Sequence, residues 1–114
     1  MENIMYNELI CRGYSVDVGV VDIFETGPEG KRKRVSCEID FVINKGAKRY
    51  YIQSALSLGN AQKEKAELRP LLGVRDFFRK ILVTKSGMKP WMDEQGILHL
   101  GLYEFLLDPA ALDF

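Results

Sequence analysis

The sequence has no excess of either charge, since sixteen Lys and Arg balance sixteen Asp and Glu. A neutral chain has no global attraction for nucleic-acid phosphates or for anionic membrane surfaces. It also has no apolar run near the ~20 residues that a membrane-spanning helix needs. Its start, Met1-Glu2-Asn3, lacks the basic and apolar regions of a signal peptide. We therefore expect a cytoplasmic protein that does not bind membranes.

Cysteine and histidine are scarce. The chain has two Cys, Cys11 and Cys37, with no CxxC pair, and a single His, His99. This set argues against a structural zinc site and favours two reduced cysteines in apolar positions. The sequence also lacks a Gly-x-x-x-x-Gly-Lys-Ser/Thr loop, because the stretch Gly27 to Lys31 has the wrong spacing. We therefore expect no nucleotide or other cofactor to bind to this chain.

What is present is an ordinary globular composition, with 46% hydrophobic residues over 114 residues. This length predicts a single domain, 1–114, with its own core. Hydrophobic periodicity and turn residues predict the following elements. They are a helix over Met1 to Arg12, a strand over Ser15 to Phe24, a loop over Glu25 to Lys33, strands over Val35 to Ile43 and Lys48 to Ala55, a helix over Asn60 to Leu72, a strand over Arg79 to Thr84, a loop over Lys85 to Gln95, a strand over Ile97 to Gly101, and a helix over Leu102 to Leu107. The order α-β-β-β-α-β-β-α indicates an α/β domain with a mixed central sheet flanked by helices.

The most informative stretch is the predicted hairpin around Lys45-Gly46-Ala47. Strict alternation would place Cys37, Ile39, Phe41 and Ile43 on one face of its first strand, and Asp40 on the other. A carboxylate inside an apolar strand is costly unless it is exposed, paired or functional. Asp40 is therefore the leading candidate for a site residue. The alternatives are a metal ligand, a former ligand that now makes hydrogen bonds, or an exposed strand residue.

Several blocks of sequence together resemble the DUF4143 family, a domain of the PD-(D/E)XK or restriction-endonuclease-like fold found behind an AAA-type ATPase module. The blocks are Glu2-Asn3-Ile-Met-Tyr-Asn7-Glu8-Leu9, Arg12-Gly13-Tyr14, Glu38-Ile39-Asp40-Phe41-Val42, Tyr51-Ile52-Gln53, Arg69-Pro70-Leu71-Leu72, Ile81-Leu82-Val83-Thr84 and Leu102-Tyr103-Glu104-Phe105-Leu106-Leu107. The resemblance implies a restriction-endonuclease-like sheet. It also implies that this domain is the C-terminal part of a longer ATPase.

The resemblance also implies a site. Active members carry an acid on the first helix, an Asp on one strand and Glu-x-Lys on the next, which hold a divalent ion and orient water. These positions fall on Glu8, Asp40 and Gln53-Ser54-Ala55. Gln53 supplies no negative charge and Ala55 supplies no cation. The catalytic candidates are thus Asp40, Gln53 and Glu8 in a degenerate site, with Asp40 and Glu8 as the only charged metal ligands.

The function expected from this pattern is that of a catalytically inactive nuclease-fold domain, a regulatory or interaction module of an AAA-type ATPase. One alternative is a metal-dependent DNA nuclease using Mg²⁺, in which Lys63 or Arg69 of the following helix replaces the missing lysine. A second alternative is a DNA-binding module that does not cleave. The basic run Lys31-Arg32-Lys33-Arg34 could contact phosphate, but without net charge or interleaved aromatics a solvated hairpin tip is the favoured interpretation.

Overall fold

The computed structural model describes residues 2–55, 68–74, 76–84, 89–108, 110 and 112. Its elements are α1 (Glu2–Cys11), β1 (Ser15–Thr26), β2 (Arg32–Lys45), β3 (Lys48–Ala55), β4 (Arg79–Thr84), β5 (Trp91–Met92), β6 (Ile97–Gly101) and α3 (Leu102–Leu107). Residues 68–72 are also helical, and the remainder of the predicted helix from Asn60 lies outside the described residues. No helix in these described ranges is long and apolar enough to cross a membrane.

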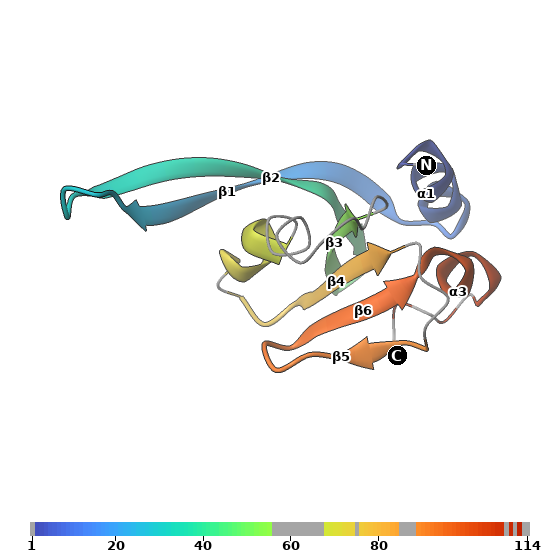
Figure 1. Ribbon diagram of the computed structural model, residues 1–114. Helices are drawn as coiled ribbons and strands as arrows, with labels where there is room; N and C mark the ends of the chain where they lie inside the picture. Colours follow the sequence, from blue (N-terminus) through green and yellow to red (C-terminus); the bar gives the residue numbers. More distant parts are fainter. Residues whose placement is uncertain are drawn as a thin grey trace.

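The strands form one six-stranded mixed sheet in the order β1-β2-β3-β4-β6-β5 (Figure 1). Strand β2 pairs antiparallel with β1 and β3, whereas β4 runs parallel to β3 and β6. The expected α/β class with a mixed sheet is confirmed, and the strand order is consistent with a restriction-endonuclease-like arrangement. One element was missed. The predicted loop from Lys85 to Gln95 contains β5, which pairs antiparallel with β6 and is too short to show a hydrophobic period.

The sheet carries a core on each face. The first core cluster contains Met5 and Leu9 of α1 with Phe105 of α3. Its strand members are Phe41, Ile43, Tyr50, Ile52, Ile81, Val83, Leu98 and Leu100. The second core cluster, on the other face, combines Ile39, Tyr51, Ala55, Leu71, Leu82 and Ile97. Since Leu71 belongs to residues 68–72, helices flank the sheet on both sides.

Strands β1 and β2 continue well beyond the body as a two-stranded ribbon (Figure 1). We define the arm as Gly19 to Thr26 of β1 with Arg32 to Ile39 of β2, which pair from Gly19↔Ile39 to Thr26↔Arg32. The predicted loop over Glu25 to Lys33 is therefore wrong at both ends, and the true turn is shorter. Toward its free end the arm has few neighbours to bury its side chains, so polar residues can occupy strand positions there without a hydrophobic pattern.

A β-bulge marks the base of the arm. The register moves from Asp17↔Val42 to Gly19↔Ile39, so Val18 faces two residues of β2, Asp40 and Phe41. The extra residue reverses the alternation of β2. Ile39 therefore packs in the second core cluster, whereas Phe41 packs in the first. The predicted common face for Cys37, Ile39, Phe41 and Ile43 is wrong for this reason.

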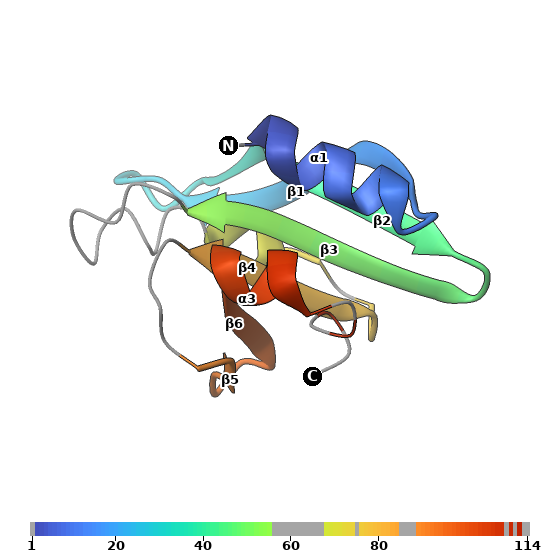
Figure 2. The ribbon, with the colours of Figure 1, turned by 90° about the vertical axis from the view of Figure 1, so that its right-hand side faces the viewer.

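The first and last helices lie at the same end of the sheet, away from the free end of the arm (Figures 1 and 2). Arg12, just after α1, joins them. Its Nε donates to Oε1 of Glu8 at 2.9 Å, and its Nη2 donates to the carbonyl oxygen of Phe105 at 2.5 Å. The guanidinium also lies 4.7 Å from the centre of the Phe105 ring. One side chain therefore fixes α1 against α3 by an ion pair, a hydrogen bond and a cation–π contact.

Candidate functional site: the Asp40 bulge

Asp40 lies at the bulge, where the regular pairing of β2 with β3 stops. The last regular pair is Phe41↔Ile52. Beyond it, the Asp40 carboxylate takes the place of a backbone acceptor. Its Oδ2 accepts a hydrogen bond from the backbone N–H of Ser54 at 2.9 Å and another from the Ser54 hydroxyl at 2.7 Å. The carboxylate is therefore directed at β3 and satisfies polar groups that the bulge would leave without a strand partner.

Gln53 completes the same junction from the other strand. Its Oε1 accepts the backbone N–H of Asp40 at 2.8 Å, and its Nε2 lies 3.5 Å from the carbonyl oxygen of Glu38. An amide suits this position because it offers both an acceptor and a donor. Only 4% of Gln53 is exposed, so these bonds form away from bulk water. Asp40 and Gln53 are thus brought together, as expected, and they bond to the two opposite backbones.

The two side chains do not converge on a common cavity. Along β3, Gln53 points to the same face of the sheet as Tyr51 and Ala55, which pack in the second core cluster. The Asp40 carboxylate instead bonds to Ser54, which points to the opposite face, the face of the first core cluster. Ala55, the position corresponding to the nuclease lysine, is only 5% exposed. The junction therefore closes the gap at the bulge and leaves the Ala55 position within the core.

Glu8, the third predicted site residue, lies in a different environment. Its side chain is one-third exposed, and its carboxylate forms the ion pair with Arg12 described above. That pair connects it to α3. The hydrogen bonds of Glu8 and of Asp40 share no residue, so the structure joins Asp40 with Gln53 and Ser54 and leaves Glu8 with the two helices.

This donor set does not fit a divalent ion. Mg²⁺ takes carboxylate oxygens in near-octahedral geometry. Asp40 contributes one carboxylate, whose Oδ2 already accepts two hydrogen bonds, and Oε1 of Gln53 already accepts one. Within the described part of the chain, no three His, Cys, Asp or Glu residues gather in a group that could hold a metal ion. The residues that could supply a nuclease cation are also elsewhere: Arg69 lines a cleft under the arm, and Lys63 lies outside the described residues.

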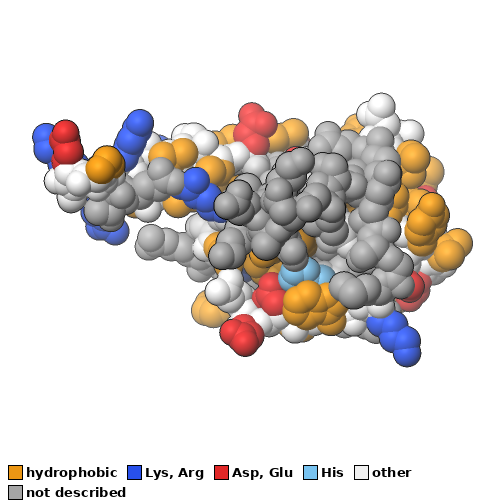
Figure 3. Space-filling model, viewed as in Figure 1, with side chains coloured by type: hydrophobic (Ala, Val, Ile, Leu, Met, Phe, Trp, Pro, Cys, Tyr) orange, Lys and Arg blue, Asp and Glu red, His pale blue; other side chains and the backbone are white. Residues whose placement is uncertain are grey.

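Two further polar clusters have no sequence motif. Near the far edge of the sheet, His99 is buried, with Nε2 2.8 Å from Oδ2 of Asp93 and its ring stacked on Trp91 at 4.0 Å between centres. Figure 3 shows this histidine, the only one in the chain, beside hydrophobic side chains. Oδ1 of Asp93 also accepts the backbone N–H groups of Gln95 and Ile97. The cluster thus fixes the turn between β5 and β6.

The second polar cluster lies at the start of β4. The Tyr51 hydroxyl donates to Oδ2 of Asp76 at 2.5 Å, while Nζ of Lys80 donates to the carbonyl oxygens of Asp76 and Phe78. Burial raises the pKa of Tyr51, and the hydrogen bond to Asp76 raises it further, with Arg49 acting in the opposite direction. The phenol therefore acts as a donor that holds the segment before β4. Sequence spacing could not reveal either cluster, because each depends on strand pairing.

Comparisons with known proteins give one relative and no fold match. No family model matches the chain. A protein of Haemophilus influenzae (strain ATCC 51907 / DSM 11121 / KW20 / Rd), described as an uncharacterized protein, is 37% identical over 84 residues. The match covers 74% of this chain but only 17% of that relative, so most of the relative lies outside the shared segment. No solved structure matches.

Proposed function

We propose that this chain is a nuclease-fold domain of the DUF4143 type that performs no hydrolysis and acts as a regulatory or interaction module of an AAA-type ATPase. The observation that carries the proposal is the closed hydrogen-bond set at the bulge. Asp40 and Gln53 both bond to the neighbouring strand's backbone, which gives these residues a role in holding the sheet together.

Two observations support a module within a larger assembly. The sequence blocks that resemble the family extend over nearly all of the chain, and the matched segment is a small part of a much longer relative. In the proposed assembly ATP binds to the ATPase module, because this chain has no Gly-x-x-x-x-Gly-Lys-Ser/Thr loop. The role of this domain is then to bind the ATPase or a protein that the ATPase acts on.

The proposal is tested by finding the partner and measuring its activity. The tagged chain is expressed in its native cells, and bound proteins are identified by mass spectrometry. We expect a protein that carries the phosphate-binding loop, and a severalfold change in its ATP hydrolysis rate when the purified chain is added. A stoichiometric complex with unchanged hydrolysis would contradict the regulatory role, and an association without any ATPase would contradict the proposal as a whole.

The nuclease alternative is tested separately. Linear, nicked and single-stranded DNA are incubated with the chain and Mg²⁺ or Mn²⁺, with Asp40→Asn as the matched variant. We expect no cleavage by either protein. Cleavage by the wild type that disappears in Asp40→Asn would establish a working nuclease. Binding of the same DNA without cleavage would favour the DNA-binding alternative, for which the basic run Lys31 to Arg34 is the available observation.

A further inference from the structure

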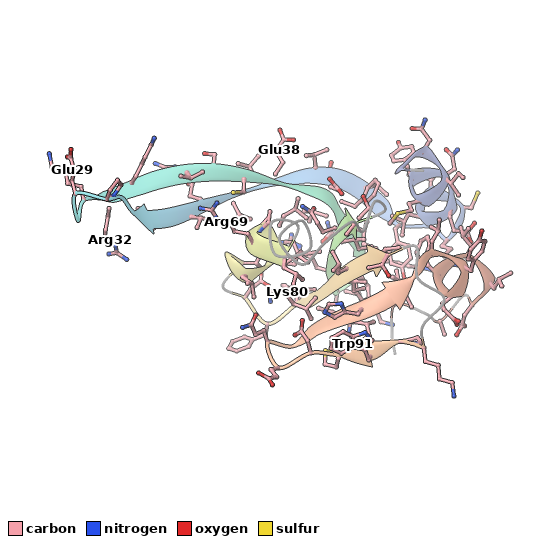
Figure 4. All side chains as sticks on the ribbon, in the orientation of Figure 1. Glu29, Arg32, Glu38, Arg69, Lys80 and Trp91 are labelled. Carbon is pink, nitrogen blue, oxygen red and sulfur yellow. The ribbon has the colours of Figure 1, made fainter. Side chains whose placement is uncertain are left out.

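A cleft of about 260 Å³ lies between the arm and the helical residues 68–72. We call it the arm cleft. Its walls are Asp22, Ile23, Phe24 and Arg32 from the arm, and Arg69, Leu72 and Gly73 from the helix and its end. Figure 4 shows Arg32 near the free end of the arm and Arg69 beside the helix below it.

Gly73 determines where this cleft begins. A Cβ atom at Gly73 would lie 2.7 Å from Cγ1 of Val21 and 3.1 Å from Cγ1 of Ile23. These distances are shorter than van der Waals contact, so only glycine lets the end of the helix lie this close to β1. The helix therefore supports β1 at Val21, and the cleft opens where the arm extends past that support.

The charges of the arm cleft favour an anion. The guanidinium of Arg32 lies over the Phe24 ring at 5.4 Å, and Arg69 lines the helix wall. Among the described residues that line the cleft, the single acid is Asp22. It is bonded to Nη2 of Arg34 and accepts the Ser36 hydroxyl at 3.0 Å. The Arg34 guanidinium holds the pKa of Asp22 below its usual value. Arg32 and Arg69 thus line the cleft, and Asp22 is paired with Arg34.

The surroundings of the arm cleft are apolar and offer a strand edge. Phe24 is 54% exposed and Leu72 49% exposed, and Val18 and Val20 elsewhere on β1 are each 67% exposed. Among the described strands, β1 pairs only with β2 and forms an edge of the sheet. A long edge strand with apolar side chains is a template for an added strand. Nucleic acid is a poorer match, because its contacts are dominated by phosphate.

We propose that the arm cleft and the β1 edge bind an extended acidic segment of a partner protein. The segment adds to β1 as a strand and places a carboxylate between Arg32 and Arg69, with apolar side chains against Phe24 and Leu72. Arginine pairs well with carboxylates because its planar fork can donate two parallel hydrogen bonds. This inference rests on the proposed role as an interaction module and names the surface and the partner chemistry.

The test uses a fluorescein-labelled peptide of alternating valine and glutamate and measures its anisotropy with the full chain. We expect saturable binding that weakens about tenfold or more in Arg32→Glu and in Arg69→Glu, because each change removes a charge-assisted hydrogen bond and adds repulsion. Lys33→Glu is the matched control, since it makes the same charge change on the arm without lining the arm cleft. We expect it to change the affinity less than twofold. Thermal melting checks that every variant folds.

A further variant should change the peptide affinity in the opposite direction. Asp22→Asn removes the one carboxylate among the described residues of the cleft wall and should tighten binding of the acidic peptide. A peptide of alternating valine and lysine should not bind. Equal losses in Arg32→Glu and Lys33→Glu would overturn the proposal, because they would indicate general electrostatic attraction.

Three other results would also overturn the proposal. The first is tighter binding of labelled oligothymidylate than of the acidic peptide. The second is a self-association of the chain that Arg32→Glu abolishes, which would put a second copy in the partner's place. The third is the absence of peptide binding at millimolar concentration. If the ATPase partner is nevertheless found and regulated, the proposed function holds and only this surface is wrong.

Discussion

The side-chain oxygen of Gln53 accepts a hydrogen bond from the backbone N–H of Asp40 at 2.8 Å, which joins β3 to β2 beyond their last regular pair. In the opposite direction, the Asp40 carboxylate of β2 accepts a hydrogen bond from the backbone N–H of Ser54 on β3. Each of the two residues most suggestive of a metal site thus replaces a missing strand-to-strand hydrogen bond. Their chemistry can be tested through stability as well as through catalysis.

Gln53→Glu should destabilise the protein by about 1–3 kcal/mol, the usual effect of leaving a buried polar group without its partner. Glutamate keeps an acceptor for Asp40 but loses the donor near the Glu38 carbonyl, and it adds a negative charge in a buried position. Urea unfolding measures the difference. Gln95→Glu makes the same change on an exposed turn residue and should stay within about 0.5 kcal/mol. Equal stability of wild type and Gln53→Glu would contradict the role assigned to the amide.

Ala55→Lys, which would restore the nuclease lysine, should be more damaging. Ala55 packs in the second core cluster, so a long side chain overpacks it, typically at about 1–3 kcal/mol, and must also bury an ammonium group. Ala47→Lys in the exposed turn is the control. We expect a clear drop in melting temperature for the first variant only. A stable Ala55→Lys protein would show that this position opens to solvent.

Gly19→Ala tests the close approach at the bulge. An added Cβ would lie 2.5 Å from Cγ2 of Val42, whereas at Gly27 the nearest atom is the Lys31 carbonyl oxygen at an ordinary 3.6 Å. We expect Gly19→Ala to cost about 1–3 kcal/mol in chemical unfolding and Gly27→Ala to have little effect. If both variants unfold at the wild-type urea concentration, the strand pairing at the bulge differs from the one described.

Stability should fall in acid partly through Asp93. Burial raises the pKa of this carboxyl, but hydrogen bonds from His99, Ile97 and Gln95 outweigh it and hold the pKa below the ordinary value of 3.8. As the pH falls, the unfolded chain is therefore protonated first, so the stabilisation is complete above about pH 4 and is lost below it. Urea midpoints in Asp93→Asn should change less between about pH 5 and pH 3 than in wild type. If the urea midpoints of the two proteins fall equally with pH, Asp93 does not contribute to the loss of stability in acid.

Sequence patterning predicts the strands that cross the body. Buried positions there, such as Ile52 and Leu82, require apolar residues, so each strand appears in the sequence as an apolar run that ends at turn residues. It fails at the bulge, since every second residue from Cys37 to Ile43 is apolar and nothing marks the extra residue. The partnership of Asp40 with Gln53 follows from the hairpin. The stacking of Trp91 on His99 does not, because it depends on a two-residue strand that is too short to show a hydrophobic period.

Arg12 has a consequence for the order in which the chain can fold. Its hydrogen-bond partner, the Phe105 carbonyl, follows it by 93 residues. The contact that joins α1 to α3 can therefore form only after α3 has been synthesised. During synthesis α1 leaves the ribosome long before α3 exists. The first helix therefore remains undocked on that side until the sheet is complete. Such long-range closure slows folding relative to local helix pairing.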